Sequence, residues 1–192
     1  MSSNAYADWR TNRRAALDEI AAAHRAIGGP RRGRRYATQQ VNHAYAVLLS
    51  PQFQGYCRDL YRESAYHLAG HLSPVPGPIV LAEFLRDLKL SHGNPNPGNL
   101  GADFNRLGIK FWNEVRAAHP VAGTRHDLLL TLNAWRNAIA HQDFDPDRLG
   151  GSTRLRLATV IGWRVACHGL ARTFDGVLRN HLTRVTGTTP WV

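Results

Sequence analysis

A short stretch in the second half of the chain, Asn133–His141, carries side chains that could cleave a phosphodiester. Arg136 holds a fixed charge in a planar fork that matches phosphate oxygens. His141 can change its charge near neutral pH, so it can give or take a proton. These roles suffice to cleave RNA without a metal. The ribose 2′-hydroxyl attacks the neighbouring phosphate, His141 moves protons, Arg136 stabilises the developing charge, and Asn137 orients the ring or the substrate.

An amphipathic helix over Thr124–Phe144 is expected to position these groups. Thr124 and Asp127 form a capping box at its start, and the Asp145-Pro146 pair ends it. Its apolar face repeats at helical spacing and consists of Leu128, Leu132, Trp135 and Ile139. The opposite face spans about 140° of arc and consists of Asn133, Arg136, Asn137, Ala140 and His141. Spacing alone also fits a structural polar network, which is the more frequent origin of such a face.

The segment NAWRNAIAH, Asn133–His141, resembles the signature of the HEPN superfamily (higher eukaryotes and prokaryotes nucleotide-binding domains). That signature is an arginine, a polar residue and a histidine four to six positions after the arginine, which Arg136, Asn137 and His141 match. The upstream segment Val41–Leu68 also resembles the bacterial RiboL-PSP-HEPN-like group, so the similarity covers about residues 36 to 185.

The resemblance implies a metal-independent endoribonuclease, often found in toxin–antitoxin, phage-defence or RNA-processing systems. Family members commonly form homodimers in which the motif helices face each other. Some members instead bind nucleotides, RNA or proteins without catalysis, and this is the alternative function. Chemistry also favours a dimer, because strand scission needs both a base and an acid. One chain offers one well-placed histidine, whereas a two-fold axis beside His141 would supply two.

The charge of the chain favours an RNA partner. The sequence has 24 Lys and Arg against 14 Asp and Glu, a formal net charge of +10. Four arginines cluster in the segment RRGRR, where they form either a phosphate-contacting strap or a solvated turn. The weaker RNA-binding candidates are therefore Arg31, Arg32, Arg34, Arg35 and Asn133.

The apolar pattern predicts an all-α protein, a helical bundle of four or more long helices. The expected helices are 5–27, 37–49, 51–72, 79–90, 103–119, 124–144 and 153–185, with Gly187 ending the last. We expect a break at Ser50-Pro51 and an exposed loop at 91–101 that acts as a connector or a substrate lid. Residues 1–35 are expected to form an N-terminal helix and basic loop, and residues 36–187 the HEPN-like domain.

Other patterns argue against a membrane, a metal or a cofactor. The N-terminus lacks the apolar run of a signal peptide, and no stretch has the roughly 18 apolar residues of a membrane helix. Cys57 and Cys167 give no disulfide or metal spacing. His67 and His71 have the spacing of a helical metal pair, but no motif places a third ligand. We therefore expect a soluble cytoplasmic protein, with any antitoxin on a separate chain.

Overall fold

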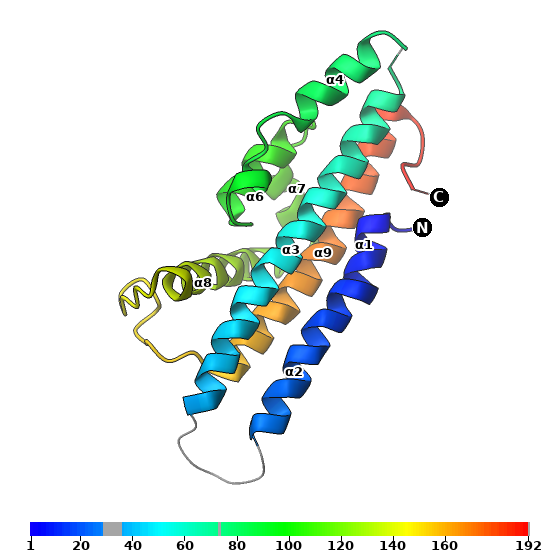
Figure 1. Cartoon of the computed structure of the whole chain (residues 1–192). Coiled ribbons are helices and arrows are strands. Elements are labelled where there is room, and N and C mark those ends of the chain that lie inside the picture. The colour runs from blue at the N-terminus through cyan, green and yellow to red at the C-terminus, as the bar shows by residue number, and fades with distance from the viewer. Residues whose placement is uncertain (29–35, 73, 192) are drawn as a thin grey trace.

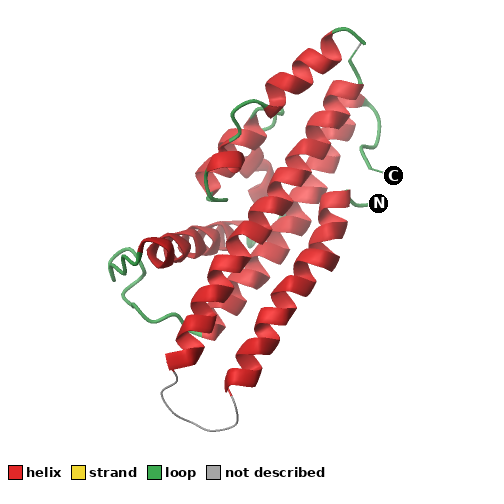
Figure 2. Cartoon of the chain, viewed as in Figure 1, coloured by secondary structure: helices red, strands yellow, loops and turns green. Residues whose placement is uncertain are grey.

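The computed structural model describes residues 1–28, 36–72 and 74–191, and these form an all-α protein (Figures 1 and 2). The described part is 77% helical and contains no strand, which confirms the predicted fold class. Two long helices, α3 (Tyr36–Gly70) and α9 (Leu157–Thr186), run side by side along the length of the molecule. Gly187 ends α9 in a left-handed conformation with φ 74°, as the sequence predicted.

The N-terminal segment packs against this central pair. It consists of α1 (Asn4–Asp8), the π-helical turn η1 (Trp9–Arg13) and α2 (Arg14–Gly28). Trp9 and Leu17 are fully buried. The backbone N–H groups of Asn4 and Ala5 donate to the Glu63 carboxylate at 2.9 and 2.6 Å, which fixes the start of α1 on α3. The extension therefore shares the core with the rest of the chain, and the domain boundary near residue 35 stays a prediction.

The predicted break at Ser50-Pro51 is wrong, because α3 continues through Pro51. Proline removes one backbone hydrogen bond from a helix interior. The burial of neighbouring side chains offsets this cost: Leu49 and Phe53 are fully buried, and α3 packs against α2, α8 and α9. Tertiary packing here overrides the local signal of the proline.

Among the described residues, four short helices connect α3 to α8: α4 (Pro76–Leu85), α5 (Lys89–His92), α6 (Pro97–Asn105) and α7 (Phe111–Ala118). The predicted loop at 91–101 is shorter than expected, because α5 and α6 occupy its two ends and only residues 93–96 between them are not helical. Asn96 caps α6 by accepting from the Asn99 N–H at 2.8 Å. Asp103, predicted to start a helix, is buried and accepts from the N–H groups of Lys89 and Leu90 at 2.9 and 2.8 Å. It therefore caps α5, a different helix from the one the sequence suggested.

Candidate functional site

The end of α8 (Ala122–His141) carries the predicted site. Leu132 and Trp135 are 0% and 4% exposed and anchor the helix in the core. The Trp163 indole of α9 donates to the Thr131 hydroxyl at 2.8 Å. The helix stops at His141 because Gln142 adopts a left-handed conformation with φ 56°. The helix ends five positions before Pro146 and three before the predicted end at Phe144, so His141 is the last residue of a firmly anchored helix.

The three signature residues all lie at this end. Arg136 is half-buried, whereas Asn137 and His141 are exposed. The Arg136 guanidinium donates from Nη1 to Asn137 Oδ1 at 3.2 Å. In the described part of the chain, the His141 ring has no hydrogen-bond partner. The imidazole is therefore available to a ligand, and the guanidinium is hydrogen-bonded to Asn137, which lies one turn before His141.

An open cavity of about 390 Å³ adjoins the site. Its lining residues are Ala134, Asn137, Ala138, His141, Asp143, Arg148 and Leu149. Arg136 is not among them, because it lies about 100° around the helix from Asn137. A single chain thus brings Asn137 and His141 together in one cavity and connects Arg136 to them by one hydrogen bond.

Arg148 is a cavity residue that the sequence analysis missed. It follows α8 on the DPDR turn and pairs with Asp145 at 3.2 Å and with Asp143 at 3.7 Å. These two carboxylates partly neutralise it, since all three side chains are on the surface. The available signal was a single arginine that follows three aspartates, Asp143, Asp145 and Asp147, at the end of the predicted helix.

An asparagine network joins the site to the loop before α6. Asn137 Oδ1 also accepts from Asn94 Nδ2 at 3.1 Å. The backbone of the same loop is held from α3, where Gln54 donates to the carbonyls of Leu90 and Gly93, both at 2.6 Å. The loop expected to be a connector or a lid is therefore fixed on two helices and borders the site.

Asn133 takes part in this network from inside the protein. It is 3% exposed, and its Nδ2 donates to Leu129 O at 2.8 Å and to Pro95 O at 3.3 Å. Its Oδ1 accepts from the Ser50 hydroxyl at 3.4 Å. Asn133 thus holds the 94–96 loop against α8 and has little surface to offer RNA. The other weak candidates, Arg31, Arg32, Arg34 and Arg35, lie outside the described residues.

His67 and His71, which have the spacing of a helical metal pair, form hydrogen bonds with threonine side chains. His67 Nε2 lies 3.0 Å from the Thr186 hydroxyl, and His71 Nε2 lies 2.7 Å from the Thr188 hydroxyl. Burial and, to a smaller extent, the neighbouring His71 lower the pKa of His67. Within the described residues no group of three or more metal-binding side chains occurs. The pair fastens the end of α3 to the end of α9.

The two cysteines are buried and free. Burial raises the pKa of the Cys57 thiol and of the Cys167 thiol. Such thiols are poor nucleophiles at neutral pH, because the thiolate is the reactive form. They belong to the core.

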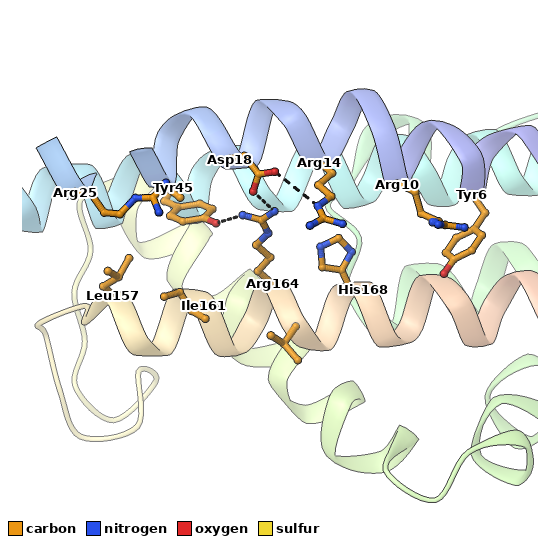
Figure 3. A pocket seen from close by; sticks show the side chains of 12 residues that line it. Tyr6, Arg10, Arg14, Asp18, Arg25, Tyr45, Leu157, Ile161, Arg164 and His168 are labelled. Atoms are coloured by element: carbon orange, nitrogen blue, oxygen red, sulfur yellow. Dashed lines mark hydrogen bonds and ion pairs between the residues drawn. The ribbon is translucent and has the colours of Figure 1, made fainter. Parts of the chain in front are cut away.

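A second basic cluster, which the sequence analysis did not single out, lines a cavity of about 610 Å³ between α2 and α9 (Figure 3). Arg14 and Arg164 flank Asp18 there, with His168 beside them. The cations come from helices far apart in the sequence. The sequence does show that Arg164, His168 and Arg172 are four residues apart along α9, which places them on one face of that helix.

No protein-family model, no curated protein and no solved structure matches the chain. Among the described helices, none combines the length and the apolar character needed to cross a membrane.

Proposed function

We propose that the protein is a metal-independent endoribonuclease of the HEPN type, with Arg136, Asn137 and His141 at the end of α8 as its catalytic residues. The observation that carries this proposal is the shared geometry of the three. His141 faces an open cavity with Asn137, and Asn137 holds the Arg136 guanidinium at 3.2 Å. This arrangement gives a mobile proton and a fixed positive charge within one turn and a half of helix.

The reaction needs no group beyond these side chains and the RNA. The 2′-oxygen attacks the adjacent phosphorus while one His141 imidazole takes the 2′-hydroxyl proton. The bond from phosphorus to the 5′-oxygen then breaks, and a second imidazole, already protonated, gives its proton to that oxygen. Arg136 donates to the phosphoryl oxygens, where negative charge increases. The products are a 2′,3′-cyclic phosphate and a 5′-hydroxyl.

The second imidazole comes from a second copy of the chain in this proposal. Leu130 is 46% exposed and lies on the same face of α8 as Ala134, Asn137 and His141. An exposed leucine beside small side chains suits a helix packed across a two-fold axis. Such a dimer would place two His141 rings and two Arg136 side chains around one cleft.

The cellular role and the location of the protein are also part of this proposal, and they rest on the resemblance to HEPN proteins alone. A toxin or phage-defence effector that cuts RNA in the cytoplasm, with an antitoxin on a separate chain, is the setting that HEPN nucleases suggest. The net charge of +10 supports RNA as the partner.

The test is incubation of total RNA with the purified protein in excess EDTA, followed by analysis of the new RNA ends. We expect cuts that end in cyclic phosphate with the wild type and none with His141→Ala or Arg136→Ala. Lys110→Ala, an exposed cation that lines neither cavity described above, is the matched control and should cut like the wild type.

Equal cleavage by wild type and His141→Ala would contradict the assignment of the catalytic residues. Negligible cleavage by all proteins would favour the alternative, a non-catalytic module that binds RNA, a nucleotide or a protein through the same residues. One observation favours that alternative: Arg136 does not line the cavity that contains His141. In a catalytic dimer, the guanidinium must reach the cleft from the edge of each helix.

A further inference from the structure

A second open groove runs along α9, away from the end of α8. The cavity of about 610 Å³ between α2 and α9 continues into one of about 670 Å³ beside the start of α8. The two share Tyr6, Val165 and His168 as lining residues. Together they extend from Leu157 to Asn180, about 35 Å at the rise of an α-helix. We call this combined surface the α9 groove.

The α9 groove is strongly basic. Two histidines, His119 and His168, line it together with six arginines, and Asp18 is the one carboxylate among its described lining residues. The arginines are Arg10, Arg14, Arg25, Arg125, Arg164 and Arg172. Clustered cations between low-dielectric walls concentrate a positive potential, which attracts polyanions.

One of these arginines, Arg164, is held in place by several contacts. The Arg164 guanidinium donates to the Asp18 carboxylate at 2.6 Å and to the Tyr45 hydroxyl at 2.8 Å (Figure 3). Only 14% of the Arg164 side chain is exposed. Asp18 also pairs with Arg14 at 3.6 Å, so it organises two cations while neutralising one. The groove therefore presents one fixed cation, Arg164, among arginines that are mostly exposed on the surface.

His168 adds a donor of defined direction. Its Nδ1 accepts from the Trp9 indole at 2.8 Å, so in the neutral ring Nε2 carries the proton. Burial, followed by Arg164 and Arg14, lowers the pKa of His168, which keeps the ring neutral at pH 7. The neutral ring can donate a hydrogen bond into the groove.

The floor of the groove favours a flexible chain over a packed helix. Ile161 and Val165 are 45% and 61% exposed and can contact sugars and base faces. At Gly169, where small residues could let a partner helix approach, the Arg125 guanidinium covers the backbone. A helix docking along α9 would have to displace this charge, whereas a phosphate could bind to it.

We propose that the α9 groove binds the sugar–phosphate backbone of single-stranded nucleic acid without sequence preference. Each cavity has the volume of a small-molecule site, which a single strand can enter and a duplex cannot. The groove is independent of the proposed catalytic residues. Arg125, its contribution from α8, precedes His141 by 16 positions, about 24 Å along the helix.

The test is fluorescence anisotropy with a labelled 2′-O-methyl oligonucleotide of about 12 residues. This strand has no 2′-hydroxyl, so the proposed nuclease reaction cannot cut it and binding is read separately from cleavage. Arg10→Gln/Arg172→Gln changes two exposed groove arginines. Arg62→Gln/Arg154→Gln is the control of equal charge, because both residues are exposed and line neither cavity. Unchanged melting temperatures would show that both variants fold.

We expect the groove variant to raise the Kd about tenfold or more at low salt, and the control to change it about twofold or less. The slope of log Kd against log salt should fall by about 1.4 for two lost contacts with a single strand. His141→Ala should bind like the wild type. Such binding without any cleavage of ordinary RNA would refute the nuclease proposal and leave the groove standing.

Three results would overturn the proposal. The first is equal affinity of the groove and control variants. The second is binding that depends on Arg136 and His141 but not on Arg10 and Arg172, which would place the strand at the end of α8. The third is binding of an acidic helical peptide in the groove with no affinity for the oligonucleotide, which would assign the groove to a protein partner.

Discussion

The end of α8 and the α9 groove hold their charged groups in opposite ways. At the end of α8, one exposed histidine and one half-buried arginine are tied to the fold through a single amide. In the α9 groove, the Arg164 cation is fixed by Asp18 and Tyr45, and the neutral His168 ring is fixed by Trp9. Catalysis needs a group whose proton can move, whereas retention of a polyanion needs fixed charge. We therefore propose chemistry for the first region and binding for the second.

The largest expected effect is the loss of catalysis in His141→Ala. In a dimeric cleft this change removes both the base and the acid, so the cleavage rate should fall by about 10⁴ or more. Because His141 is exposed, the free energy of unfolding should change by less than about 0.5 kcal/mol. Cleavage assays and urea unfolding measure the two quantities.

Mixing the wild-type protein with His141→Ala tests whether both histidines act in one cleft. After subunit exchange at equal concentrations, about one quarter of the dimers contain two wild-type chains. Activity at saturating protein should then fall to about one quarter if each cleft needs both histidines. A fall to one half would show that each chain acts alone, contrary to the shared cleft.

Trp9→Ala should cause the largest loss of stability. Trp9 is fully buried, contacts Phe53 and Tyr56, and donates to His168. Its removal leaves a cavity under η1 and should cost about 3–5 kcal/mol in urea unfolding. Tyr66→Ala is the control, because that aromatic side chain is 57% exposed and should change stability by less than about 0.5 kcal/mol. A loss at Trp9 as small as the control's would mean that η1, which holds His168 through Trp9, is not part of the core.

Asn133→Ala should have an intermediate effect at the end of α8. It leaves the Pro95 carbonyl and the Ser50 hydroxyl without their amide partner, at a cost of about 1–3 kcal/mol in the free energy of unfolding. The loop that contacts Asn137 should also loosen, which lowers the cleavage rate at an unchanged Kd for the 2′-O-methyl strand. A rise in that Kd without a change in rate would instead make Asn133 a binding residue.

Sequence patterns predicted much of the fold, but they did not predict which side chains of different helices contact one another. The helices α8 and α9 and the polar face at Arg136 were readable from periodicity within one segment, and Gly187 marked the end of α9. The capping box predicted at Thr124 and Asp127 was wrong, because α8 begins at Ala122 and its N-cap residue, Val121, makes no side-chain cap hydrogen bond. Local rules failed at Pro51, where packing kept the helix intact, and at Asp103, which caps a helix earlier in the chain. Similarly, periodicity placed Asn133 on the polar face, whereas the 94–96 loop covers it.

The α9 groove was missed for the same physical reason. Asp18 and Arg164 are 146 positions apart, and their pairing depends on how α2 lies against α9. The helix expected at 5–27 was found. Helical spacing of its apolar residues predicts a buried face that includes Ala15, Ala23 and Ile27, yet these three are exposed, whereas Leu17 is buried. With the buried face placed correctly, Arg10, Arg14 and Arg25 would have appeared together on one flank.

The smallest expected effect concerns pH and His168. Burial, Arg164 and Arg14 lower its pKa in the folded state, while Asp18 acts in the opposite direction. The unfolded chain therefore binds a proton more readily, and stability should decrease as pH falls below about 6.5 towards the folded-state pKa. His168→Asn keeps an acceptor for Trp9 and cannot be protonated, so its stability should decrease less over this range. Asp175 and Glu63, whose pKa values burial raises, are present in both proteins and cancel in the difference. Parallel pH profiles in urea unfolding would contradict this role of His168.

A single-turnover titration with one labelled RNA substrate tests the division between the two regions most directly. The enzyme concentration is varied in EDTA, and each protein yields a maximal cleavage rate and a half-saturating concentration. We predict that His141→Ala abolishes the maximal rate, while fluorescence anisotropy of the same labelled RNA shows that this variant still binds it with the wild-type Kd. Arg10→Gln/Arg172→Gln should raise the half-saturating concentration about tenfold and keep the maximal rate. A His141→Ala protein that still cuts at the wild-type rate would contradict the account.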